Sequence, residues 1–211
     1  MIPYNYIVIE GCIGAGKTTL AKMIGNEYSA EQVLEQFNEN PFLAKFYADP
    51  VHYAFPVEMT FLMERYRQLK KLLSERDLFT DFVIGDYFID KCVIFSRNNL
   101  LPDEYNLYRS VFDVLSSYLP KPDIILYLYN DIPRLLRNIA GRGREYERNI
   151  SADYLEHIQQ SYLTYFKEHA AMPVLLLEAS KLDFVKNQGD YDKIKALIET
   201  SYPAGIHRIT F

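Results

Sequence analysis

The sequence predicts an α/β fold in three layers, with a parallel five-stranded sheet, helices on both faces and a single domain over residues 1–211. Two observations support this prediction. Short apolar runs alternate along the chain with longer stretches in which apolar residues recur at helical spacing. The first run, YIVIE (6–10), is followed directly by a glycine-rich loop and then by a helical pattern. A strand, loop and helix in this order are typical of parallel α/β sheets.

The glycine-rich loop, residues 11–18, reads GCIGAGKT and matches the P-loop pattern G-x-x-x-x-G-K-[ST]. Its glycines let successive N–H groups surround phosphate oxygens, and the helix that follows adds its positive end. We expect Lys17 to reach the outer phosphates of ATP and the Thr18 hydroxyl to bind Mg²⁺. The residues expected to contact the ATP phosphates are Gly11, Cys12, Ile13, Gly14, Ala15, Gly16, Lys17, Thr18 and Thr19. The motif therefore predicts a P-loop NTPase.

Composition limits the alternatives. The chain is 49% hydrophobic and 24% charged, which is ordinary for a soluble globular protein. Its net charge of −5 argues against binding to polymeric nucleic acid, which requires a basic surface. Two cysteines are too few for a disulfide framework, and one lies in the phosphate loop, so we expect a reducing, cytoplasmic location. We find no signal peptide and no apolar run of membrane-spanning length, and expect no membrane partner.

The other elements follow from periodicity. After the strand at 5–10, the predicted strands are 32–36, 82–85, 123–129 and 173–178. The predicted helices are 17–28, 56–73 with Pro56 as its first residue, 104–119, 151–169 and 190–201. In the helix at 104–119, the face formed by Leu107, Val111, Leu115 and Tyr118 is predicted to pack in the core. The last segment, IHRITF, is a candidate for an added strand.

Two acids lie at the ends of predicted strands. Ligands of parallel sheets bind beyond the carboxyl ends of the strands, where we expect Glu35 and Asp86. Asp86 suits a water-mediated contact with Mg²⁺. For Glu35, position alone also fits an ordinary solvated glutamate at a strand end.

The stretch at 40–55, NPFLAKFYADPVHYAF, resembles the deoxyribonucleoside kinase family. The family pattern there is N-P-x-L-x-x-F-Y-x-[DN]-P-x-x-[YW]-[AS]-F, after a strand that ends in a carboxylate. The resemblance implies that Glu35 is the general base for the 5′-hydroxyl of a nucleoside, a role that suits a carboxylate within hydrogen-bond reach. It also implies that Tyr47 binds the sugar 3′-hydroxyl and that Phe55 belongs to the substrate site.

By the same resemblance, Glu58 and Arg65 read the base edge. The family usually has glutamine at the first position, and this chain has a carboxylate, which only accepts hydrogen bonds. Guanine offers two adjacent donors, so we predict a purine substrate, deoxyguanosine or deoxyadenosine, with Arg65 donating to O6 of guanine. The alternative interpretation is a Glu58–Arg65 ion pair on the surface.

The sequence departs from the family after the third strand. The family reads [ED]-R-S where this chain has Asp86, Tyr87 and Phe88, so the acid is kept and the arginine is missing. Lys91, about one helical turn later, is a candidate to supply the missing charge. Lysine is a point charge and not a planar fork, so the two would not be equivalent.

Two later segments also resemble the family. The lid, about 138–150, has the form R-G-R-x-x-E with Arg142, Arg144 and Glu147. Its arginines would join Lys17 in stabilising the moving phosphoryl group, with Glu147 in the substrate site, while Gly141 and Gly143 permit closure. A basic solvated loop is the alternative. Asp183 and Phe184 would lie over the adenine of ATP.

Taken together, these residues predict an ATP- and Mg²⁺-dependent deoxynucleoside 5′-kinase of nucleotide salvage, and the resemblance implies a homodimer. Two alternatives stay open: a thymidylate-kinase-like enzyme that phosphorylates a nucleoside monophosphate, and a nucleotide-binding regulator that has lost catalysis.

Overall fold

A computed structural model describes residues 2–36, 40–74, 80–169 and 171–211. Within these residues six strands form one sheet in the order β2-β3-β1-β4-β5-β6, and every neighbouring pair is parallel. The strands are β1 (Tyr6–Gly11), β2 (Glu31–Val33), β3 (Val83–Gly85), β4 (Ile124–Tyr129), β5 (Pro173–Glu178) and β6 (Gly205–Ile209). The prediction of five strands is therefore wrong by one. The candidate strand at the chain end is real, and Ile206 pairs with Val174 of β5.

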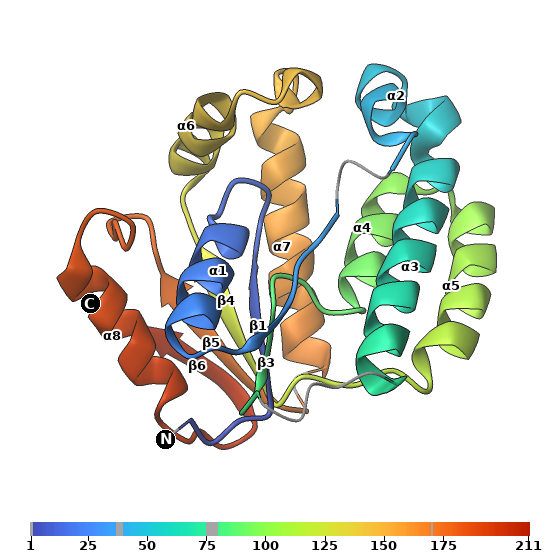
Figure 1. Cartoon of the computed structure of the whole chain (residues 1–211). Helices are drawn as coiled ribbons and strands as arrows, with labels where there is room; N and C mark the ends of the chain where they lie inside the picture. The colour runs from blue at the N-terminus through green and yellow to red at the C-terminus, as the bar shows by residue number, and fades with distance from the viewer. Residues whose placement is uncertain (1, 37–39, 75–79, 170) are drawn as a thin grey trace.

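Helices cover both faces of the sheet, as predicted. They are α1 (Lys17–Glu27), α2 (Leu43–Ala48), α3 (Pro50–Ser74), α4 (Lys91–Asn99), α5 (Pro102–Ser116), α6 (Ile132–Arg142), α7 (Ala152–His169) and α8 (Gln188–Ile198), with a short 3₁₀ helix, η2 (Glu145–Glu147). Figure 1 shows α1 and α8 on one side of the sheet, and α7 with the α3–α4–α5 group on the other. The molecule is thus a three-layer α/β fold.

The core lies between the central strands and α7. All six residues of β1 are buried, as are the first five of β4, which fits strands covered on both faces. Aromatic rings fill the space beneath α7, where Tyr127 of β4 contacts Tyr162 and Phe166 at centroid separations of 5.2 and 5.5 Å. This packing fixes the sheet against the helix layer.

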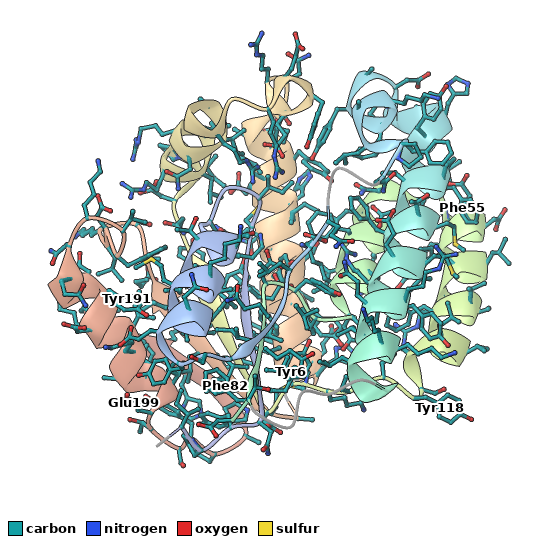
Figure 2. The ribbon with its side chains drawn as sticks, viewed as in Figure 1. Tyr6, Phe55, Phe82, Tyr118, Tyr191 and Glu199 are labelled. Atoms are coloured by element: carbon teal, nitrogen blue, oxygen red, sulfur yellow. The ribbon has the colours of Figure 1, made fainter. Side chains whose placement is uncertain are left out.

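Two helix predictions need correction. Pro56 lies inside α3, because the helix begins at Pro50 and tolerates the lost hydrogen bond six residues later. In α5 the buried side chains are Tyr108 and Phe112, one position along from the predicted face. Leu107 and Tyr118 are instead 59% and 85% exposed, and Figure 2 shows Tyr118 at the edge of the molecule. One residue is about 100° of helix rotation, so the predicted stripe lies to one side of the buried face. Val111 and Leu115 of that stripe are half-buried and pack against the core, as predicted.

The first part of the predicted lid belongs to a helix. Helix α6 begins at an Asp131 cap, whose carboxylate accepts from Arg134 N at 2.7 Å, and includes Gly141. Gly143 ends the helix in the left-handed conformation, at φ 70°. In the described ranges no helix is long and apolar enough to cross a bilayer.

Candidate active site

The carboxyl ends of the strands meet at the upper edge of the sheet in Figure 1. The phosphate loop follows β1, Glu35 lies two residues beyond β2, and Asp86 follows β3 directly. Between the phosphate loop, α6 and the 179–186 segment lies a cleft of about 740 Å³. This volume is within the range of small-molecule sites, about 300–1,000 Å³.

Two glycines let the loop approach its neighbours closely. Gly14 (φ 82°) and Gly16 (φ 93°) adopt left-handed conformations, which side chains disfavour. A Cβ on Gly14 would lie 2.9 Å from Leu135 O of α6, and one on Gly16 would lie 3.0 Å from the ring of Phe184. Helix α6 and the predicted adenine loop therefore lie directly against the phosphate loop.

Most of the predicted phosphate-binding residues line the cleft. Those that do are Gly14, Ala15, Gly16, Lys17, Thr18 and Thr19. Lys17 Nζ donates to the carbonyls of Gly11 (2.9 Å) and Cys12 (3.0 Å), neither of which lines the cleft. Burial, followed by repulsion from Lys91, lowers the pKa of Lys17.

Thr18 and Asp86 lie together, as a magnesium site requires. The Thr18 hydroxyl donates to Asp86 Oδ2, and Asp86 Oδ1 accepts from Glu35 N at 2.8 Å. Across the described segments, no group of three or more His, Cys, Asp or Glu side chains forms a metal cage. A hydroxyl and one carboxylate fit Mg²⁺, which takes its other ligands from phosphates and water.

Glu35 is buried between two cations. Its side chain is 2% exposed, Oε1 accepts from Arg65 Nε at 2.9 Å and from Nη2, and Oε2 accepts from Lys91 Nζ at 2.7 Å. Burial alone would raise the pKa of Glu35, but Arg65 and Lys91 outweigh it and lower the pKa to about 2. Glu35 is therefore an ionised buried group, and the solvated-glutamate interpretation is wrong.

The two unusual residues after Asp86 are packing residues. Tyr87 is fully buried, donates to Gln68 Oε1 at 2.6 Å and presents its ring to Arg65. Phe88 stacks on Phe166 in the core, at a centroid separation of 6.2 Å. Besides Arg65, the cation beside Glu35 is Lys91, the first residue of α4.

A second cavity adjoins the cleft across this cluster. Arg65 and Lys91 line it, while their partner Glu35 lines the cleft. Its wall consists of Ile13, Leu43, Phe46, Tyr47, Val57, Glu58, Phe61, Arg65, Lys91, Phe95, Asn99, Glu147 and Tyr154. Phe55 is not among these residues and lies on the far side of α3 from the phosphate loop in Figure 2, so the structure does not bring it into the predicted site.

The second cavity is narrow. It has about 50 Å³ of free space, room for a few waters. Tyr47 stacks on Tyr146 of η2, with centroids 6.0 Å apart and rings inclined by 16°. A nucleoside therefore requires side chains of α2 and the lid to move outward, a common scale of change on binding.

Glu58 and Arg65 do not form the alternative surface ion pair. Both are buried, and the hydrogen bonds of Arg65 go to Glu35 and to Cys92 Sγ (3.0 Å). Glu58 Oε1 accepts from Asn99 Nδ2 at 2.6 Å, and Oε2 has no hydrogen-bond partner in the described part of the chain. Burial raises the pKa of Glu58 to about 7.

The lid arginines converge on one acid. Arg142 and Arg144 both donate to the buried Glu147, and both line the cleft. Asn138 of α6 donates to Gly14 O at 2.8 Å. These contacts hold both arginines beside the cleft, while Gly141, Gly143 and Arg148 around them are exposed to solvent.

Asp183 and Phe184 line the cleft, and sequence reasoning missed other residues of its wall. Asn130, Arg134 and Lys186 line it. The position of Asn130 directly after β4 is the signal that could have found it, because strand ends surround the ligand in such sheets.

Comparison with known proteins decides the family. The sequence profile of the deoxynucleoside kinases matches residues 7–202. The chain belongs to the deoxynucleoside kinase family. Among its deoxynucleoside kinase relatives, the deoxyguanosine kinase of Bacillus subtilis is 36% identical over 92% of this chain and 96% of its own length. The deoxyadenosine/deoxycytidine kinase of the same organism is 29% identical over 92% and 91% of the two chains.

Solved structures agree. The deoxyadenosine kinase of M. mycoides with bound dATP superposes with a TM-score of 0.80 at 25% identity, covering 92% of this chain and all of the other. The predicted resemblance to deoxynucleoside kinases is thus confirmed, together with the three-layer fold.

Proposed function

We propose that this protein transfers the γ-phosphoryl group of ATP to the 5′-hydroxyl of a purine deoxynucleoside. The observation that carries the proposal is the position of Glu35. Its carboxylate lines the phosphate cleft, while both of its cationic partners line the second cavity. A hydroxyl entering from that cavity would meet the carboxylate and the last phosphate together, which is the geometry that in-line transfer requires.

The proposed phosphoryl transfer makes one bond, breaks one bond and moves one proton. The 5′-oxygen bonds to the γ-phosphorus, the bond from that phosphorus to the β–γ bridging oxygen breaks, and the 5′-proton passes to Glu35. Lys17, Arg142 and Arg144 line the cleft and would stabilise charge on the transferring group. Thr18 and Asp86 would hold Mg²⁺, which neutralises charge on the phosphates.

Lys91 has a second proposed role, besides its ion pair with Glu35. At rest Glu35 is a weak base, because Arg65 and Lys91 hold its pKa low. We propose that Lys91 turns toward the γ-phosphate when both substrates are bound, replacing the arginine missing after Asp86. Losing that contact raises the pKa of Glu35 and makes it a better proton acceptor.

Two observations favour a purine. Of the relatives named above, the one with the higher identity is a deoxyguanosine kinase, and the other is named for deoxyadenosine as well as deoxycytidine. In this chain Glu58 places a carboxylate in the cavity wall, where the N–H groups of a purine edge could reach it.

The decisive assay offers radiolabelled ATP with a panel of nucleosides and monophosphates. We expect label on deoxyguanosine and deoxyadenosine. Label on monophosphates supports the thymidylate-kinase-like alternative, and ATP binding without transfer supports the regulator. A Glu35→Gln variant should bind ATP normally and lose at least about 100-fold in kcat. Full activity of this variant would remove Glu35 from the mechanism.

We also propose a homodimer formed through the α5 face. Leu107 and Val114, two turns apart on α5, are 59% and 71% exposed, and such apolar residues on a helix face favour a protein contact.

We also propose a cytoplasmic location. Cys12 and Cys92 are buried and form no disulfide, which fits a reducing compartment.

A further inference from the structure

Glu58 is a buried carboxyl group that forms no ion pair with the residues that the structure describes. The residue is 3% exposed on the wall of the second cavity. Oε1 is engaged by Asn99, which is itself held by Tyr154 through a hydrogen bond of 3.2 Å to Asn99 Oδ1. Oε2 is a buried atom with no hydrogen-bond partner among the described residues. A buried polar atom without a hydrogen-bond partner, located in a cavity wall, is well placed to bind a polar group of a ligand.

The charges around Glu58 come from several elements, and the two cations that act on it are already paired with another acid. Arg65 on α3 and Lys91 on α4 attract the carboxylate, but both are paired to Glu35, whose own charge repels it. The other titratable groups that face Glu58 are Cys92 on α4, Tyr108 on α5 and Tyr154 on α7. Burial therefore dominates, and the pKa rises to about 7.

We infer that Glu58 selects between guanine and adenine by its protonation state. This inference rests on the proposed function. Ionised Glu58 only accepts, so it matches the adjacent N1–H and N2–H donors of guanine. Protonated Glu58 donates through Oε2 to N1 of adenine and accepts from the N6 amino group. One side chain thus serves both purines, and the pH decides which one it favours.

The direction of the effect follows from proton linkage. Deoxyguanosine binding favours the ionised form, so it releases a proton below about pH 7, and its binding strengthens as the pH rises to that value. Deoxyadenosine binding favours the protonated form, so it weakens as the pH rises above about 7. The ratio of the two kcat/KM values, deoxyguanosine over deoxyadenosine, should rise with pH on both sides of neutrality. The limiting slope is about tenfold per pH unit.

The test measures kcat/KM for both nucleosides with the full-length protein from about pH 6 to about pH 8. The ratio cancels the titration of Glu35, Lys17 and ATP, because these groups serve both substrates. We expect the ratio to rise by at least about tenfold over this range. In parallel, calorimetry in two buffers of different ionisation enthalpy should show proton release on deoxyguanosine binding near pH 6.5 and proton uptake on deoxyadenosine binding near pH 7.5.

A Glu58→Gln variant fixes the donor–acceptor pattern. Its amide should favour deoxyadenosine at every pH, with a flat ratio, while Glu156→Gln, the same change on the exposed side of α7, should keep the parental slope. If the parent phosphorylates both nucleosides with a ratio constant to within about twofold and binds both without proton exchange, the inference is wrong and the proposed function stands. If neither nucleoside is phosphorylated at any pH, the proposed function itself fails.

Discussion

Replacing Lys91 by methionine tests how this site works without an arginine after Asp86. The pKa of Glu35 falls from 4.5 to about 2, against the opposing effect of burial. That net shift corresponds to about 3 kcal/mol in favour of the ionised form, after Arg65 and Lys91 together have offset the cost of burial. Lys91 is the partner of Oε2, so its loss should remove a large part of this stabilisation. We expect Lys91→Met to unfold more easily at pH 7, by about 1–3 kcal/mol.

The kinetic effect should be larger than the effect on stability. If Lys91 turns to the γ-phosphate during transfer, the variant loses a cation that stabilises the transition state, and kcat should fall about 10²–10³-fold. The nucleoside KM should change less, because Glu58 and Arg65 remain. Lys91→Arg restores the charge and should recover part of kcat.

The pH profile separates this role from simple damage. A carboxylate with a depressed pKa is stabilising above its unfolded pKa near 4.5, and this contribution disappears as the pH falls toward 2. In Lys91→Met the pKa of Glu35 in the free enzyme rises, so the acid limbs of kcat/KM and of stability should move to higher pH. A parental kcat together with an unmoved acid limb of kcat/KM in Lys91→Met would refute the reasoning.

Three further outcomes are expected. Gly14→Ala should weaken ATP binding, measured by calorimetry, and lower stability by about 1–3 kcal/mol, because φ is 82° and the new Cβ would meet Leu135 O at 2.9 Å; an unchanged Kd would contradict this. Arg142→Ala should reduce kcat about 100-fold, whereas Arg148→Ala, whose side chain is 72% exposed, should leave the rate unchanged; equal effects would point to a general loss of lid structure. Val114→Lys should convert a dimer to a monomer in light scattering, and an unaltered mass would move the dimer interface elsewhere.

Local patterns predicted the parts of the fold that depend on local physics. The strand–loop–helix context of the phosphate loop, the central strands and the helices at 151–169 and 190–201 were recognisable because each repeats one spacing of apolar residues. Helix α2, six residues long, is too short to show such a period. Strand β6 alternates half-buried and exposed residues at the sheet edge, so its sequence left it only a candidate.

The contacts that make the site could not be predicted in the same way. Glu58 and Arg65 are seven residues apart, which puts them on one side of α3, and an ion pair was a reasonable alternative. Arg65 instead binds Glu35, which lies thirty residues earlier in the chain, and this contact depends on the position of β2 in the sheet. Periodicity along one helix carries no information about that distance.

The structure places Lys91 beside Glu35 although the arginine expected after Asp86 is missing. The resemblance places a cation immediately after Asp86, where this chain has a tyrosine that packs against Arg65. The first residue of α4 then supplies a cation from another direction, with Nζ 2.7 Å from Glu35. Because charge acts over distance and lysine is flexible, the position of a cation in space matters more than its position in the motif. Lysine lacks the fork of arginine, so it can hold the carboxylate or the phosphate, but it has less capacity to bind both at once. A site built this way should couple the basicity of Glu35 to the arrival of ATP, which is why the pH profile of Lys91→Met is the sharpest test of the mechanism.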